Sequence, residues 1–249
     1  MGIIVENTSF ESEGFKLLGR VYRPEKPGRY PAVVICHGYP GDNKNTDLAN
    51  ELVLNDIVAL IFYYRGAWGS GGQFRLRGLE PSTRDAVEHL VSMPFVDGGR
   101  VGLIGYSMGA VPVAARLSSD PRLRTGAFIS PASDLGALAP RESLDAVVPV
   151  FINMGRGKLA SLEAGVVKED LLWVLENQNP VDMIGRVRVP VLVLVGSNDQ
   201  MTPPSACRAL HDAANEPKEW LLIEGANHDY SEHRMPLIDA VLDWLKKRL

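Results

Sequence analysis

The residues with the clearest chemical potential are Ser107, Asp199 and His228, in that order along the chain. Ser107 is the centre of Gly-Tyr-Ser-Met-Gly, which follows an apolar run and precedes a helical pattern. A serine flanked by glycines in a tight strand-to-helix turn is held in a strained backbone conformation that exposes its hydroxyl at the start of the helix. We therefore expect Ser107 to be a nucleophile rather than part of an incidental turn.

A serine hydroxyl needs a general base, and a histidine base needs a carboxylate that orients it. Asp199 and His228 each follow a predicted apolar strand, at the carboxyl-terminal edge where the sites of open α/β sheets collect. The order Ser, Asp, His is that of α/β hydrolases and differs from the orders of chymotrypsin-like and subtilisin-like enzymes. We predict a catalytic triad in which Ser107 is the nucleophile, His228 the base and Asp199 the orienting acid.

Two backbone N–H groups, those of Tyr39 and Met108, are expected to hold an oxyanion. Met108 directly follows the nucleophile, at the positive end of the predicted helix. Tyr39 lies in the sequence His-Gly-Tyr-Pro-Gly that starts at His37. Gly38 lets this backbone approach the nucleophile, and Pro40 has no N–H to donate. We interpret His37 as a brace for the loop rather than as the base.

The other candidate groups suit this chemistry less well. His89 and His211 fall in amphipathic helical patterns, where a solvated or packed histidine is the usual role. His233 follows His228 by five residues, a spacing that matches no H-E-x-x-H zinc pattern, so no metal is expected. Asp182 is a rival acid, but it precedes a predicted strand instead of following one.

The elements that must position these residues follow from the hydrophobic pattern. Nearly continuous apolar runs predict strands covered on both faces, as in a parallel sheet, at residues 32–36, 57–62, 101–105, 127–129 and 189–195. Helical patterns alternate with them at residues 47–55, 82–93, 108–117 and 204–214, before a last strand at 219–223 and an amphipathic C-terminal helix. Residues 3–22 predict an antiparallel hairpin at a sheet edge.

The alternation lapses between residues 133 and 186, where short helical pieces are separated by Gly and Pro. We expect this segment to be a cap over the carboxyl-terminal edge of the sheet, within a single domain of residues 1–249. Some apolar cap residues are candidates for the walls of a substrate pocket, although packing of the cap onto the core explains them equally well: Leu144, Val147, Phe151 and Trp173.

Composition excludes several classes of protein. The chain has 26 basic and 30 acidic residues, a formal charge of −4 and no basic cluster longer than its terminal Lys-Lys-Arg, so no nucleic-acid partner is expected. Cys36 and Cys207 are far apart in the sequence and are expected to be free thiols. The N-terminus lacks a secretory pattern, so we expect a cytoplasmic protein without a membrane partner. The sequence leaves open whether it is a monomer or a dimer.

Together, these motifs resemble the α/β-hydrolase superfamily, in particular small carboxylesterases akin to cinnamoyl and feruloyl esterases and the catalytic domains of acylaminoacyl-type peptidases. The resemblance is carried by H-G-Y-P-G at 37–41, Y-R-G-x-x-x-S at 64–70, G-Y-S-M-G at 105–109, G-S-N-D at 196–199 and G-A-N-H at 225–228. It implies a mostly parallel eight-stranded sheet with helices on both faces, an antiparallel edge strand and a cap after the sixth strand. It also implies acyl-enzyme chemistry on a small-molecule ester without a cofactor.

Departures from these families narrow the expected function. Tyr39 and Pro40 replace glycines of the H-G-G-G form, which argues against a hormone-sensitive-lipase-like enzyme. The 249 residues have no room for the propeller of the related peptidases, so we expect a carboxylesterase before a peptidase. Amidase, thioesterase and perhydrolase chemistry use the same triad and stay open. A non-catalytic binding protein typically lacks a triad residue, and the glycine spacing does not fit a nucleotide-binding G-x-G-x-x-G.

Overall fold

The computed structural model describes residues 2–249 and is built around one sheet with the strand order β1-β2-β4-β3-β5-β6-β7-β8. From β4 to β8 all neighbouring strands are parallel, whereas β2 is antiparallel to both β1 and β4. The strands are β1 (Ile3–Ser12), β2 (Phe15–Pro24), β3 (Tyr30–Cys36), β4 (Val58–Phe62), β5 (Val96–Tyr106), β6 (Leu123–Ile129), β7 (Val191–Gly196) and β8 (Lys218–Ile223).

This topology confirms the predicted fold class, an α/β hydrolase with a mostly parallel eight-stranded sheet. It also confirms the N-terminal hairpin. The edge strand β1 pairs antiparallel with β2, as expected. The strand β2 is also antiparallel to β4, so it is β2, the second strand of the sheet, that runs against the others.

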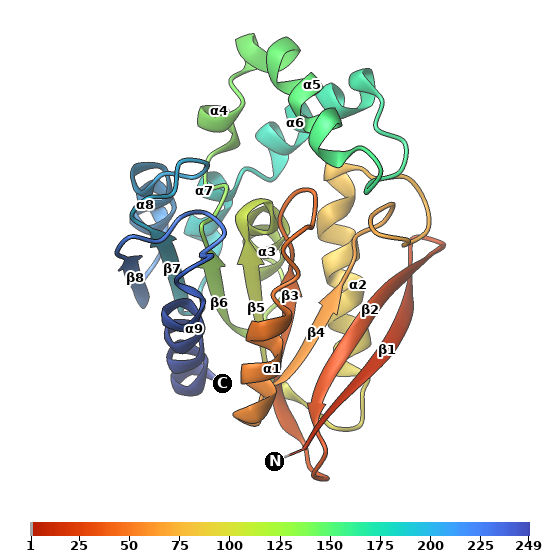
Figure 1. Cartoon of the computed structure of the whole chain (residues 1–249), viewed down its shortest axis with the longest axis vertical. Coiled ribbons are helices and arrows are strands. Elements are labelled where there is room, and N and C mark those ends of the chain that lie inside the picture. Colours follow the sequence, from red (N-terminus) through yellow and green to blue (C-terminus); the bar gives the residue numbers. More distant parts are fainter. Residues whose placement is uncertain (1) are drawn as a thin grey trace.

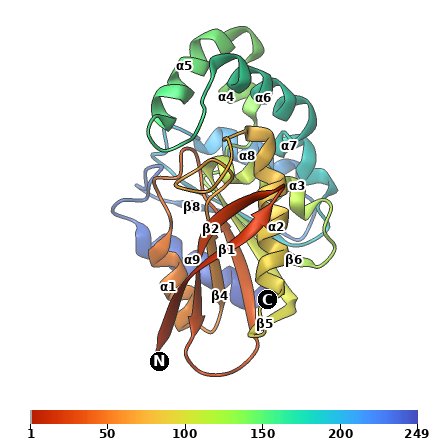
Figure 2. The ribbon, with the colours of Figure 1, turned by 90° about the vertical axis from the view of Figure 1, so that its right-hand side faces the viewer.

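Helices cover both faces of the sheet (Figures 1 and 2). The helices α1 (Thr46–Leu54) and α9 (Arg234–Arg248) pack on one face, and α2 (Leu79–Val91), α3 (Ala110–Leu117) and α8 (Pro204–Ala213) pack on the other. Within β3, Val34 packs on the face covered by α2, α3 and α8, while Val33 and Ile35 pack on the face covered by α1 and α9, because successive side chains of a strand point to opposite faces. Within residues 2–249, no helix is long and apolar enough to cross a membrane.

The chain between β6 and β7 leaves the sheet and forms helices beyond the carboxyl ends of the central strands (Figure 1). These are α4 (Leu135–Leu138), α5 (Leu144–Gly155), α6 (Ala164–Asn177) and α7 (Pro180–Met183), and we call α4 to α6 the cap helices. Single turns of 3-10 helix complete the chain: η1 (Leu76–Gly78), η2 (Ser107–Gly109), η3 (Arg141–Ser143) and η4 (Ile184–Arg186).

Buried and exposed ion pairs hold the cap helices over the sheet. The carboxylate of Asp170 on α6 is 1% exposed and receives Arg75 and Arg77, each at 2.6 Å. Lys158, which follows α5, pairs with Asp42 at 2.6 Å. These contacts bind the cap to two loops that leave the carboxyl ends of β3 and β4, which are the loops nearest the predicted site.

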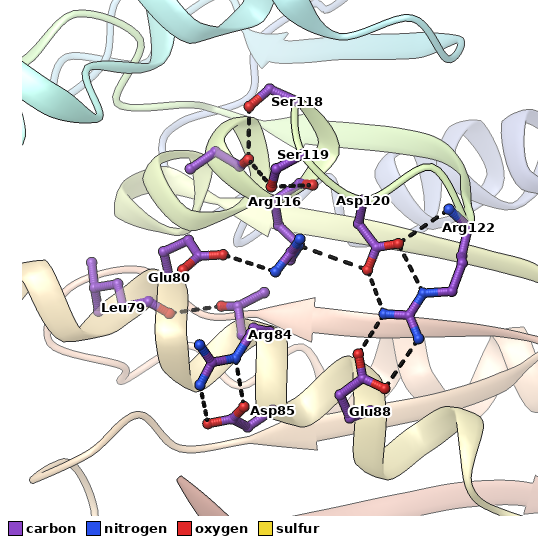
Figure 3. A network of polar contacts seen from close by, with 12 residues as sticks. Leu79, Glu80, Arg84, Asp85, Glu88, Arg116, Ser118, Ser119, Asp120 and Arg122 are labelled. Carbon is purple, nitrogen blue, oxygen red and sulfur yellow. Dashed lines mark hydrogen bonds and ion pairs between the residues drawn. The ribbon is translucent and has the colours of Figure 1, made fainter. Parts of the chain in front are cut away.

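A second ionic network joins α2 to α3 and to the turn after α3 (Figure 3). Arg116 of α3 pairs with Glu80 of α2 at 3.2 Å, and Arg122 pairs with Glu88 of α2. Arg122 also reaches Asp120 at 2.7 Å, and the Asp120 side chain is only 3% exposed. Because α3 begins directly after the predicted nucleophile, this network fixes the helix on which that residue depends.

We predict that Asp120→Asn lowers the free energy of unfolding by about 1–3 kcal/mol, because a buried group that accepts charged hydrogen bonds loses its charge. The matched variant Glu88→Gln removes an ion pair in which the glutamate is 52% exposed. Its cost should stay below about 1 kcal/mol. Urea unfolding at neutral pH measures both. Equal losses in the two variants would contradict a central role for Asp120.

Candidate active site

Ser107 lies at a turn in which backbone meets backbone. Its φ angle is +51°, in the left-handed region that non-glycine residues rarely adopt. A Cβ atom on Gly109 would lie 2.2 Å from the carbonyl oxygen of Cys36, and one on Gly105 would lie 2.8 Å from the carbonyl oxygen of Gly109. Only glycine fits at either position, which explains the motif physically. The turn presents Ser107 at the start of η2 and α3.

The loop after β3 presses directly against this turn. A Cβ atom on Gly38 would lie 2.9 Å from the Cβ of Ser107, so this glycine is also required by close approach. Tyr39 and Met108 line one cavity together with Ser107. The structure therefore brings both candidate oxyanion donors to the candidate nucleophile. The hydroxyl of Tyr39 donates to the carbonyl oxygen of Phe151 at 2.6 Å, which holds the loop against α5.

Asp199 and His228 form a buried pair beyond the ends of β7 and β8. The Nδ1 of His228 lies 2.8 Å from Oδ2 of Asp199, whose side chain is fully buried. With Nδ1 engaged in this way, Nε2 is the ring nitrogen left to exchange a proton with a nucleophile. His228 and Ser107 line the same cavity. The three residues predicted from their chain order thus come together at one site.

The surroundings of Asp199 favour its ionised form. Burial raises the pKa of Asp199, but hydrogen bonds from His228 and from the backbone N–H of Thr202 lower it, and the pKa lies below its ordinary value. Oδ1 accepts the N–H groups of Met201 at 2.9 Å and of Thr202 at 2.8 Å. The Thr202 hydroxyl lies 2.9 Å from Oδ2 and 3.2 Å from Nδ1 of His228. Asp199 is therefore a carboxylate that can orient the imidazole and stabilise its protonated form.

Tyr106 is a site residue that the sequence analysis did not single out. Its hydroxyl donates to the carbonyl oxygen of His228 at 2.6 Å and lies 3.3 Å from the carboxylate of Asp229. The ring centroids of Tyr106 and His228 are 5.4 Å apart. Since Tyr106 directly precedes Ser107, the end of β5 carries the nucleophile and also holds the loop of the base. An aromatic residue beside the serine was visible in the motif, but its partner lies more than a hundred residues away.

Two cavities meet at Ser107 and share Tyr39, Met154 and Met201. The first, which we call the polar cavity, has a volume of about 220 Å³, and its further walls include Asp42, Asn43, Tyr106, His228 and Asp229. The second, the apolar cavity, has a volume of about 190 Å³, and its further walls include Met108, Leu135, Leu138, Ala139 and Phe151. The candidate nucleophile therefore faces two compartments of different chemistry.

Of the apolar residues predicted as pocket walls, Phe151 lines the apolar cavity. Leu144, Val147 and Trp173 are not among the residues that line either cavity. Leu144 is 1% exposed and belongs to the buried core, and Val147 and Trp173 are partly buried and pack against that core. The wall comes from α4 and the residue after it instead. Hydrophobicity alone does not distinguish a pocket wall from a packed core residue, because both are apolar and both lie in the cap.

The remaining candidates have other partners. His89 of α2 contacts the Thr8 hydroxyl at 2.6 Å, and His211 of α8 lies edge-on to Trp220. The carboxylate of Asp182 accepts a hydrogen bond from an asparagine three residues earlier in the chain. In the part of the chain that the structure describes, residues 2–249, no cluster of His, Cys, Asp and Glu could hold a metal ion.

An eight-stranded, mostly parallel sheet with this turn after its fifth strand defines the chain as an α/β hydrolase. It belongs to the X-Pro dipeptidyl-peptidase (S15) family, whose model matches residues 13–142. This agrees with the resemblance to α/β hydrolases that include both esterases and peptidase domains.

Relatives and solved structures extend the likeness over most of the chain. An uncharacterized protein of Mycobacterium tuberculosis is 29% identical over 225 residues, which cover 88% of this chain and 70% of that protein. Est1E from Butyrivibrio proteoclasticus has a TM-score of 0.77 and 17% identity, over 97% of this chain and 98% of that one. A putative dipeptidyl aminopeptidase IV from Bacteroides ovatus also has a TM-score of 0.77 and 17% identity, over 99% of this chain but 36% of that one. At these identities, the two structures show a shared fold.

His37 is buried at the start of the loop that carries Tyr39. Nδ1 of His37 lies 2.7 Å from the carbonyl oxygen of Gly38, and Nε2 is buried without a hydrogen-bond partner among residues 2–249. Burial lowers the pKa of His37 to about 4, and the nearby charge of Lys44 contributes in the same direction. His37 is therefore neutral at neutral pH and packs against the ring of Tyr64, with centroids 4.4 Å apart.

This lowered pKa predicts a loss of stability in acid. Between the ordinary pKa of 6.5 and about 4, the unfolded chain binds a proton that the folded His37 refuses. The free energy of unfolding should thus fall as the pH drops through this window. The variant His37→Asn should show a shallower fall. Urea unfolding from neutral pH down to about pH 4.5 measures the slope of the unfolding free energy against pH in the wild type and in His37→Asn. This range lies within the window in which a histidine with a lowered pKa affects stability. Equal slopes would show that His37 does not carry the effect.

Proposed function

We propose that this hydrolase is a serine esterase that cleaves carboxylic esters through an acyl-enzyme on Ser107. The observation that supports this most strongly is the buried pair of Asp199 and His228, joined at 2.8 Å, with its histidine on the same cavity as the strained serine. A buried carboxylate paired with a histidine is costly to retain for stability alone. Beside a partly exposed serine on a tight turn, the pair fits the geometry of nucleophilic catalysis.

In the proposed cycle, Nε2 of His228 takes the proton of Ser107 as its Oγ attacks the ester carbonyl carbon. Asp199 holds the imidazole by Nδ1 and stabilises the imidazolium. The N–H groups of Tyr39 and Met108 donate to the oxyanion of the tetrahedral intermediate. His228 then protonates the departing alcohol. Water, deprotonated by the same histidine, attacks the acyl-enzyme, which releases the acid and restores the serine.

Peptide hydrolysis is the second candidate, and the match to the X-Pro dipeptidyl-peptidase family favours it. It would use the same three residues, with His228 protonating an amine instead of an alcohol. An alcohol is a better leaving group than an amine, so we expect this site to cleave esters faster than the corresponding peptides. Amide and thioester analogues of the same acids, assayed beside the esters, would show whether Ser107 also acts on those bonds.

We predict that Ser107→Ala lowers kcat for p-nitrophenyl esters by about 10⁴-fold or more, since a triad without its nucleophile retains little activity. The matched control is Ser119→Ala, because the Ser119 hydroxyl donates only to the carbonyl oxygens of Ala115 at 3.0 Å and Arg116 at 3.3 Å, at the end of its own helix. The control should keep wild-type activity. Full activity in Ser107→Ala would show that Ser107 is not the nucleophile. If the wild-type enzyme cleaved an X-Pro p-nitroanilide but no ester, the peptidase hypothesis would replace the esterase proposal.

We predict that Tyr106→Phe lowers kcat by about 10-fold while KM changes less, because the loop of His228 loses one hydrogen bond worth about 1–1.5 kcal/mol. The control is Tyr30→Phe, which removes a similar bond to the carbonyl oxygen of Lys26 at 2.7 Å, far from the site. Tyr106→Phe should also broaden the pH dependence of kcat, as the base becomes less well placed. If the Tyr106 hydrogen bond were purely structural, Tyr106→Phe and Tyr30→Phe would change kcat by similar factors, and the pH dependence of kcat would stay as in the wild type.

A further inference from the structure

We infer that the preferred substrate is an ester of a compact apolar acid with a polar alcohol, and that a cationic alcohol is favoured over a neutral one. The inference rests on the proposed esterase function. It assigns the acid to the apolar cavity and the alcohol to the polar cavity that meet at Ser107. The assignment follows from which residues line each cavity.

The position of the base sets the direction of the substrate. The departing alcohol oxygen takes its proton from His228, so it must lie within hydrogen-bond reach of that ring. His228 lines the polar cavity but is not among the residues that line the apolar one. Met108, whose N–H is proposed to hold the oxyanion, lines the apolar cavity. With the alcohol toward His228, the acyl chain extends into the apolar cavity.

The apolar cavity suits a compact acyl group. Its volume of about 190 Å³ is smaller than the roughly 300–1,000 Å³ of pockets that enclose whole drug-sized ligands. Its wall beyond Ser107 is formed by Leu135, Leu138, Ala139 and Phe151. Ala139 is the smallest of these and is 2% exposed, so a larger side chain at this position would shorten the cavity.

Two carboxylates line the polar cavity, those of Asp42 and Asp229, and only Asp229 has no ion-pair partner among residues 2–249. Asp42 pairs with Lys158 at 2.6 Å. Asp229, which follows His228 in the chain, is exposed, and its carboxylate accepts a hydrogen bond from the hydroxyl of Tyr106 at 3.3 Å. In the part of the chain that the structure describes, no Lys, Arg or His side chain forms an ion pair with Asp229. A positive charge on the departing alcohol would find this carboxylate in the same cavity that His228 lines.

The acyl side is tested with p-nitrophenyl esters of straight-chain acids of increasing length. In Ala139→Phe, we expect the ratio of kcat/KM for a medium-chain ester to that for the acetate to fall about 10-fold or more, because each excluded methylene forfeits binding. The control is Ala213→Phe, an exposed position on α8. If Ala139→Phe does not fold, Leu138→Ala should shift the preference toward longer acids. An unchanged chain-length profile in a folded variant of either kind would overturn the assignment.

The alcohol side is tested with acetylcholine and 3,3-dimethylbutyl acetate, which have the same shape and differ in charge. The wild type should prefer the cation, and Asp229→Asn should lower that preference about 2- to 5-fold, as expected for one exposed charge pair. The preference should also weaken with salt. Asp243→Asn on α9 is the control and should leave the ratio unchanged. Equal rates for the two esters in the wild type would overturn the charge preference.

These outcomes differ from a failure of the proposed function. An enzyme that cleaves none of the esters would remove the esterase proposal itself. If the enzyme cleaves these esters, but Ala139→Phe changes only its preference among alcohols, then the acid and the alcohol occupy the opposite cavities. The esterase proposal would still stand in that case.

Discussion

The site depends on one close approach, that of the turn after β5 to the end of β3. Backbone lies against backbone there, and a side chain on Gly109 would collide with the carbonyl oxygen of Cys36. This contact allows a non-glycine residue, Ser107, to be held in the left-handed region, because the surrounding structure stabilises a conformation that would cost energy in a free chain. The same contact brings the loop of Gly38 and Tyr39 beside the serine. The proposed nucleophile and its oxyanion donors are thus products of a single packing constraint.

The parallel sheet supplies the rest of the arrangement. Strands that run in the same direction end at the same edge, so the loops after β3, β5, β7 and β8 meet there. Asp199 and His228 come from the last two of these loops and are buried together, with Thr202 and two backbone N–H groups satisfying the carboxylate. Tyr106 then ties the loop of His228 to the strand that carries the serine. The geometry of the site is therefore set by strand ends and not by long flexible segments.

The cap divides the space above this edge into two compartments. Its helices are fastened by Asp170 to Arg75 and Arg77, by Lys158 to Asp42 and by Phe151 to Tyr39. Residues of α4 close the apolar compartment, whereas the loops of Asp42 and of Asp229 leave the other one polar. The chemistry of the proposed reaction resides in the sheet edge, and the choice of substrate resides in what the cap and these two loops place around it.

The parallel sheet and the residues that gather at its edge were determined by the sequence alone. Apolar runs covered on both faces predict a parallel sheet, and residues directly after such runs must gather at one edge, so Ser107, Asp199 and His228 could be named together from their order and spacing. Glycine at positions 38, 105 and 109 signalled backbone contact before any partner was known. The meeting of these residues at one edge could be predicted because strand periodicity and tight turns are local properties of a chain.

Only the tertiary structure decided which side chains meet across long separations. Tyr106 finds a carbonyl group that lies 122 residues away, and nothing near it in the sequence indicates that contact. The cap shows the same limit, since Leu144 and Phe151 lie on one helix and are both apolar, yet one packs into the core and the other lines the cavity. Burial depends on how a helix is rotated against its neighbours, and that rotation is set by contacts with the whole fold.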